Sequence, residues 1–317
     1  MIRRFRAGAV AALVVAAAAC SSGSGDGGDG DSGGGAGGGD REPAAAETPG
    51  GNAAEAGPPF AVERRTVEMV DGSRPTDAYP PASVAARPDR TLEVHLVHPD
   101  EVEGPFPLLV WAHGWNGTNE AFLPFAERLA RQGYAVALPE FPLSREGVAN
   151  GDDVQNQPAD MSFVIDEVLE LGLADGEHVA VGGHSLGAAT VFGVAFNTCC
   201  LDERIDAAIA VSGGGLVFEG GEYLEEDTVP LLLVHGVRDP GVPIGVGDAT
   251  FENQPPPITY LRLNEADHVS VFEGANGAVF EQAMLAFLDA ELRGDESGMA
   301  ALPEVVADSG LAELRTK

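Results

Sequence analysis

The chain of 317 residues is poor in basic residues and in cysteine. Lys317 is its only lysine, and 18 basic residues face 50 acidic ones, so the formal net charge is -32. A field this negative repels nucleic acid, and we therefore expect no nucleic-acid partner. The three cysteines and seven histidines show no spacing typical of a zinc site, which argues against a structural zinc module.

The first 20 residues have the pattern of an export signal. Arg3, Arg4 and Arg6 form a basic start, and the apolar run 7–19 is too short for a membrane-spanning helix with normal flanks. Cys20 ends this run, in an arrangement that resembles a bacterial lipoprotein cleavage site, where the cysteine becomes the first mature residue and carries lipid. We expect an exported protein anchored to a membrane surface through Cys20, with plain secretion as the alternative.

Composition divides the rest of the chain into three parts. Residues 21–59 are rich in glycine, alanine and aspartate without apolar periodicity, which predicts a disordered tether. Regular strand and helix patterns run from 60 to 293, which predicts one folded domain. Residues 294–317 follow no clear pattern, and we treat them as a C-terminal tail.

Apolar patterns between 60 and 293 predict alternating strands and helices. Alternating residues over 62–70 and 91–98 predict half-exposed edge strands. Continuous apolar runs predict buried strands, over 107–112, 134–138, 178–182, 205–211, 231–235 and 258–263. Helices are predicted over 119–131, 159–173, 186–196 and 278–292. This order predicts an α/β fold with a mostly parallel, doubly wound sheet, helices on both faces and an antiparallel start.

The sequence Gly183-His184-Ser185-Leu186-Gly187 has the form G-x-S-x-G and lies between a buried strand and an apolar helix. That setting predicts a nucleophile elbow, in which the serine occupies a tight turn with strained backbone angles. Its neighbours must be small, and the helix N-terminus favours developing negative charge. The alternative is an ordinary turn with a capping serine. Ser185 is our candidate nucleophile.

A nucleophilic serine needs a base, and the base needs a carboxylate that orients it. Asp239 follows the predicted strand 231–235, and His268 follows 258–263, so both lie at the same sheet edge as Ser185. Their order along the chain, serine then acid then histidine, is the order found with this elbow. Asp267 would point away from the neighbouring His268 ring. We therefore predict Ser185, Asp239 and His268 as catalytic residues.

The tetrahedral intermediate of acyl transfer needs two backbone donors. We expect the amide of Leu186 and the amide of Trp115, in the loop 113–117 after an early strand. Gly114 lets this loop approach the substrate closely, and the indole of Trp115 offers an apolar wall. Gly114, Trp115 and His184 are the candidate substrate-binding residues.

Four stretches of the sequence resemble the α/β-hydrolase superfamily, namely VWAHGWNG, VAVGGHSLG, LLLVHGVRDPGVP and ITYLRLNEADHV. The likeness is nearest to the dienelactone-hydrolase-like and secreted lipase or polyester-hydrolase (cutinase-like) branch, and it covers about Val62 to Leu292. It implies hydrolysis of small or polymeric carboxylic esters through an acyl-enzyme, without metal or cofactor. Members with a dienelactone substrate use a cysteine nucleophile, so Ser185 favours esterase or lipase chemistry.

Other functions remain open at this point. A thioesterase or a peptidase would use the same three residues, and a non-catalytic binding lipoprotein would keep the same fold. Residues 140–160 and 212–230 are the only room for a lid, which predicts a shallow, open site. Adjacent Cys199 and Cys200 are either bonded to each other or a pair of buried thiols.

Overall fold

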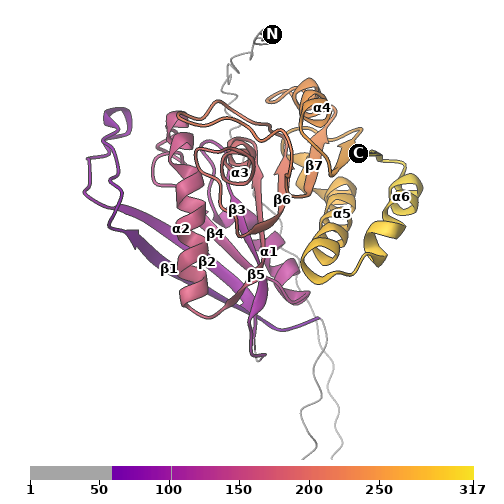
Figure 1. Ribbon diagram of the computed structural model, residues 1–317, viewed down its shortest axis with the longest axis horizontal. Coiled ribbons are helices and arrows are strands. Elements are labelled where there is room, and N and C mark those ends of the chain that lie inside the picture. The colour runs from indigo at the N-terminus through magenta and orange to yellow at the C-terminus, as the bar shows by residue number, and fades with distance from the viewer. Residues whose placement is uncertain (1–58, 101) are drawn as a thin grey trace, which may run out of the picture. The chain divides into compact units, whose positions relative to one another are not determined.

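The computed structural model of the protein describes residues 59–100 and 102–317 (Figure 1). The predicted export signal, the lipidation of Cys20 and nearly all of the tether lie outside these residues and stay predictions. Among the described helices, none combines the length and the apolar character that crossing a bilayer requires.

One nine-stranded sheet forms the centre of the domain. Its strands are β1 Val62–Asp71, β2 Arg90–Pro99, β3 Phe106–Ala112, β4 Ala135–Glu140, β5 Ala174–His184, β6 Ile205–Val211, β7 Leu231–Gly236, β8 Ile258–Leu263 and β9 Ala312–Thr316. Their order in the sheet is β1-β2-β4-β3-β5-β6-β7-β8-β9. Strands β3 to β8 pair in parallel, whereas β1, β2 and β9 join by antiparallel pairing. The predicted fold class is confirmed.

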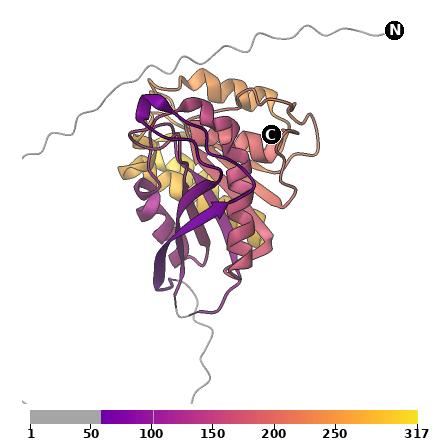
Figure 2. The same ribbon diagram turned by 90° about the vertical axis from the view of Figure 1, so that its left-hand side faces the viewer.

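Helices cover both faces of this sheet, as Figures 1 and 2 show. They are α1 Leu123–Arg131, α2 Gln157–Glu170, α3 Leu186–Phe196, α4 Ile244–Asn253, α5 Gly274–Arg293 and α6 Ser297–Ser309. Strand β3 explains why two layers are needed, because it is apolar on both sides. Its Leu108 and Val110 belong to the core beneath α2 and α3, and its Leu109 and Trp111 belong to the core beneath α1 and α5.

Helix α3 is apolar around its whole circumference. Every residue from Gly187 to Phe196 is buried, as expected for a helix enclosed on all sides. The residue before it, Ser185, therefore sits at the start of a firmly packed element.

Strand β2 differs from its predicted position at the edge of the sheet. It lies between β1 and β4, and its His95 and His98 are only 9% and 7% exposed. The prediction was wrong because β1 covers the full length of β2, from Val62 opposite Pro99 to Asp71 opposite Arg90. The alternation of apolar and polar residues in β2 therefore does not mean that one face of the strand lies in water, because both faces are packed.

The predicted domain end at residue 293 also needs correction. Residues 297–309 form α6, whose Leu302 and Val306 are buried in the core beneath α5. Strand β9 then pairs with β8, so the domain continues to the end of the chain. The sequence did not predict β9 because this edge strand has a polar pattern. It is stabilised by contacts with distant residues, such as the Arg315 guanidinium over the Phe251 ring, at 4.3 Å.

A buried ion cluster joins β2 to the start of α2. The Arg90 side chain is 1% exposed and donates two hydrogen bonds of 2.6 Å to Asp160. It also donates to Asp153, at 2.9 Å, in the short 3-10 helix Gly151–Gln155. Arg74 adds an ion pair of 2.8 Å to Asp160. Removal of one member of such a cluster leaves charges buried without compensation.

Replacing Arg90 should therefore destabilise the domain strongly. We expect Arg90→Met to lower the free energy of unfolding by about 3 kcal/mol, because Asp153 and Asp160 lose their shared partner. The matched control is Arg87→Met, whose ion pair with Asp89 is exposed, and we expect it to cost less than about 0.5 kcal/mol. Urea unfolding of both variants tests this, and equal losses would contradict it.

Candidate functional site

Ser185 occupies a strained turn between β5 and α3. Its φ is 57° and its ψ is -115°, a conformation that is costly for any residue with a side chain. The turn is possible because two glycines touch other backbone: a Cβ on Gly183 would lie 2.3 Å from the Gly187 oxygen, and one on Gly187 would lie 2.2 Å from the Ala112 oxygen. Both predicted elbow glycines are thus required by close approach, and the hydroxyl is presented at the start of a helix.

The structure brings together the three predicted side chains from separate turns. His268 Nδ1 lies 2.7 Å from Asp239 Oδ2, and His268 Nε2 lies 2.9 Å from Ser185 Oγ. Because a carboxylate only accepts, the Nδ1 hydrogen points to Asp239, and Nε2 is left to accept from the Ser185 hydroxyl. This arrangement can move a proton from the serine to the imidazole.

Asp239 is held as a carboxylate by its own loop. Its side chain is 0% exposed, and its Oδ1 accepts from the amides of Gly241 and Val242, both at 2.8 Å. Burial acts to raise the pKa of Asp239, but the hydrogen bonds from His268 and the Val242 amide bring the pKa below its ordinary value. His235 is buried beneath this loop and donates through Nε2 to the Val242 oxygen, at 2.8 Å, which gives this ring a structural role.

His184 packs beneath His268. Its Nε2 donates to the His268 carbonyl oxygen at 2.8 Å, and the two ring centroids are 4.6 Å apart. Burial of the imidazole, followed by the influence of His268, lowers the pKa of His184 to about 3, so this ring is neutral. His184 therefore fixes the backbone that carries the base, while its predicted contact with substrate stays a prediction.

The loop 113–117 lies directly against the serine. A Cβ on Gly114 would lie 3.1 Å from Ser185 Cβ, which leaves little room for any larger residue. His113 holds the loop: its Nε2 accepts from the Phe141 amide at 3.0 Å, so its Nδ1 carries the hydrogen and donates to the Gly114 oxygen at 2.8 Å. Sequence reasoning missed this role, although a polar residue that ends a buried strand was a usable signal.

Among the described residues, no protein acceptor occupies the two predicted backbone donors of the oxyanion site. The amides of Trp115 and Leu186 take no part in the backbone hydrogen bonds of the described residues. For Leu186 this follows from its place in the first turn of α3, where amides have no acceptor within the helix. The site thus combines a hydroxyl, a base, an acid and two amides that can receive an anion.

Comparisons with known proteins bear on the fold that carries this site. A family model described as Chlorophyllase matches residues 66–216. Chlorophyllase type 0 of Chenopodium album is 25% identical over 151 residues, which are 44% of this chain and 42% of that protein. The match thus spans less than half of the curated relative. The structure of a ferulic acid esterase from Streptomyces cinnamoneus superposes with a TM-score of 0.60 and 21% identity, and covers 77% of this chain and 94% of that one.

The fold is that of the α/β hydrolases. The matched range 66–216 contains Ser185 and the loop 113–117 but ends before Asp239 and His268, whose positions come from the geometry alone. The finer placement in the dienelactone-hydrolase-like and cutinase-like branch stays a prediction.

Two segments lie next to the candidate site and are referred to below as its rim; they are the two in which the sequence left room for a lid. Residues 140–160 contact the loop 113–117, through Trp115 Nε1 donating to the Ala149 oxygen at 2.7 Å. Residues 212–230 begin against the serine, where a Cβ on Gly213 would lie 2.5 Å from the Ser185 oxygen. The indole nitrogen of Trp115 is thus occupied, and its ring remains as a candidate apolar wall.

The structure also shows whether the two adjacent cysteines are bonded to each other. Cys199 and Cys200 are joined by a disulfide in the turn after α3. Cys199 packs against the small apolar cluster of Val154, Ala189 and Phe218, at the base of the segment 212–230.

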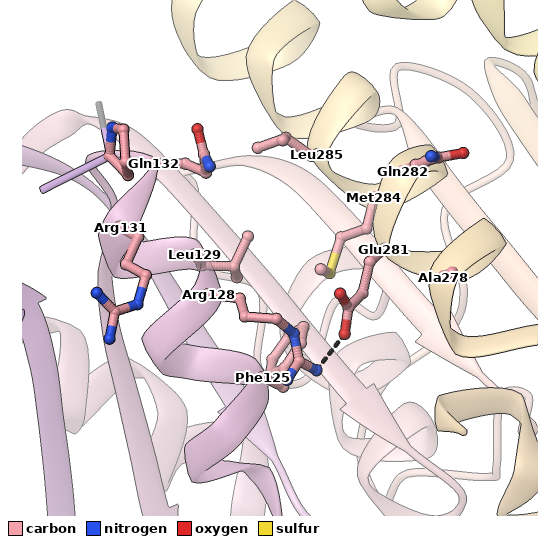
Figure 3. Close-up of a pocket in the computed structure, with 11 residues that line it drawn as sticks. Phe125, Arg128, Leu129, Arg131, Gln132, Ala278, Glu281, Gln282, Met284 and Leu285 are labelled. Atoms are coloured by element: carbon pink, nitrogen blue, oxygen red, sulfur yellow. Dashed lines mark hydrogen bonds and ion pairs between the residues drawn. The ribbon is translucent and has the colours of Figure 1, made fainter. Parts of the chain in front are cut away.

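A groove of about 360 Å³ lies away from the candidate site, between α1 and α5 (Figure 3). An ion pair between Arg128 and Glu281 crosses it. Its lining is Pro59, Phe125, Arg128, Leu129, Arg131, Gln132, Ala278, Glu281, Gln282, Met284 and Leu285. None of these is a serine, cysteine or histidine, so the groove lacks the residue types of the candidate nucleophile and base.

The neutral state of buried His113 predicts a pH dependence of stability. Burial lowers the pKa of His113 to about 4 from an ordinary value of 6.5. Between these values the unfolded chain binds a proton that the folded chain does not, so stability falls as the pH falls through this window. We expect uptake of this proton to lower the free energy of unfolding by up to about 1.4 kcal/mol for each pH unit that the pH falls within this window.

The test compares urea unfolding of the wild type and His113→Gln from pH 7.5 to pH 4.5. The variant should be less stable at pH 7.5, because it loses the ring that joins Gly114 to Phe141, and its stability should fall less steeply below pH 6.5. Parallel slopes for the two proteins would contradict the neutral, buried state of this histidine.

Proposed function

We propose that this protein is a serine hydrolase of carboxylic esters that works through an acyl-enzyme. The observation that carries the proposal is the continuous set of contacts from Ser185 Oγ through His268 to Asp239, at 2.9 Å and 2.7 Å. The solved structure that it resembles, at 21% identity, is named as an esterase, which supports the same class of reaction.

The first step is attack by the serine. His268 Nε2 accepts the hydroxyl proton as Ser185 Oγ bonds to the ester carbonyl carbon, and the carbonyl π electrons move to its oxygen. Asp239 stabilises the imidazolium that forms and keeps the ring oriented. Because the Asp239 side chain is fully buried and accepts two amide hydrogen bonds, it can do this without moving.

The oxyanion of the tetrahedral intermediate is assigned to the amides of Trp115 and Leu186. Backbone donors that are already in place stabilise this charge without reorganisation. His113 prepares the first of them, since its hydrogen bond to the Gly114 oxygen fixes the peptide immediately before Trp115. The N-terminus of α3 adds a favourable dipole at Leu186.

The second half of the cycle uses the same imidazole. His268 gives its proton to the leaving alkoxide oxygen as the carbon–oxygen bond of the ester breaks. A water molecule then loses a proton to His268 while its oxygen attacks the acyl carbon, and collapse of this intermediate returns the proton to Ser185 and frees the acid.

Small esters, polymeric esters, thioesters and amides all present a carbonyl to such a site. Ester hydrolysis is favoured because the solved structure that the chain resembles is named as an esterase, and the partial exposure of Ser185 and His268 lets a substrate reach both side chains. Substrates with one acyl group joined through oxygen, sulfur or nitrogen, together with a polyester film, separate an esterase from a thioesterase or peptidase. A non-catalytic binding protein would turn over none of them.

Loss of the serine hydroxyl should abolish the reaction. We expect Ser185→Ala to lower kcat for p-nitrophenyl acetate by at least about 10⁴-fold, because no other group can form the acyl-enzyme. Ser73→Ala, which removes an exposed serine on the turn after β1, is the matched control and should keep wild-type turnover. Circular dichroism checks that both variants are folded, and near-normal turnover by folded Ser185→Ala would sink the assignment.

A further inference from the structure

The rim of the site carries an apolar side chain that the fold does not use. Val217 is 69% exposed, which is the highest value among the large apolar side chains of the described residues. Its neighbours Leu216 and Phe218 point the other way, into the apolar cluster that also contains Leu186. Val217 therefore faces solvent from a segment whose other apolar side chains are packed next to the nucleophile.

The segment that carries Val217 is anchored to the elbow. Gly213 lies against the Ser185 backbone, and the Phe218 ring lies on Gly193 of α3, where an added Cβ would be 2.7 Å from it. The Tyr223 hydroxyl donates to the Leu216 oxygen at 2.6 Å. These contacts fix the ends of residues 213–219 but do not hold the tip itself.

Gln155 holds that tip from the other segment of the rim. Its Nε2 donates to the Val217 oxygen at 2.9 Å, and its Oε1 accepts from the Glu219 amide at 3.1 Å. One side-chain amide thus bridges the Val217 carbonyl and the Glu219 N–H, which holds the backbone that carries Val217.

Gln155 itself belongs to a firmly held element. The 3-10 helix Gly151–Gln155 is fixed to β2 by the buried contact of Asp153 with Arg90. Just before this helix, Ala149 accepts from the Trp115 indole. Hydrogen bonds therefore connect the loop of the proposed oxyanion donor, through residues 149–155, to Val217.

We propose that Gln155 is a positioning residue that holds Val217 as the acyl-side wall of the site, which makes esters of apolar acids the preferred substrates. The inference rests on the proposed function. The leaving oxygen must reach His268 Nε2, so the alcohol part of an ester lies toward His268. Its acyl part then extends to the opposite side, along Leu186 toward Val217, and an apolar chain there covers an exposed apolar side chain.

The test compares p-nitrophenyl octanoate with p-nitrophenyl acetate, because the shared leaving group confines the difference to the acyl side. We expect Val217→Ser and Gln155→Ala each to lower the ratio of kcat/KM for octanoate over acetate by about threefold to tenfold, mainly through KM. Val70→Ser is the matched control, since Val70 is 50% exposed on β1, and it should leave the ratio unchanged.

A double variant shows whether Gln155 acts through Val217. If it does, Gln155→Ala combined with Val217→Ser should have the same ratio as Val217→Ser alone, whereas independent effects would multiply. Gln155→Glu keeps the acceptor for the Glu219 amide but loses the donor to Val217, and it should fall between the wild type and Gln155→Ala.

Two results would overturn this inference while leaving the proposed function intact: an unchanged ratio of kcat/KM in active variants, including equal losses on both esters, or multiplied effects in the double variant. Failure of the wild type to hydrolyse either ester is a separate outcome. It would refute the proposed function and this inference with it.

Discussion

The site depends on close backbone contacts at the two glycines of the turn that carries Ser185. Gly187 touches the carbonyl of Ala112 at the end of β3, and Gly183 touches the carbonyl of Gly187, so the chain must turn within four residues. Ser185 bears the strained conformation that results. Burial of all of α3 from Gly187 onward supplies the packing that keeps this turn in place.

Neutral histidines hold the surroundings of the candidate base. His113 fixes the loop of the proposed oxyanion donor, His184 fixes the backbone of His268, and His235 fixes the loop of Asp239. Burial lowers the pKa of each of these three rings, so all remain neutral. His268 alone of the four contacts the serine hydroxyl, and its exposed edge leaves it accessible to substrate.

The sequence predicted the parallel strands and the three side chains at their ends, because apolar runs and a tight glycine turn are local patterns. It did not predict α4 and β9, which depend on contacts such as Arg315 with Phe251. His95 is buried because β2 lies between β1 and β4, and a local sequence pattern does not reveal the order of strands in a sheet. No sequence pattern pointed to Gln155, because its hydrogen bond to Val217 joins two segments that are far apart along the chain.

Covalent trapping shows whether the strained turn presents an activated serine. The protein is treated with a fluorophosphonate, and the modified peptide is identified by mass spectrometry. We expect one adduct per chain, on the peptide that contains Ser185, and its formation should slow by orders of magnitude in His268→Ala. Modification of a different serine, or no modification of the folded wild type, would contradict it.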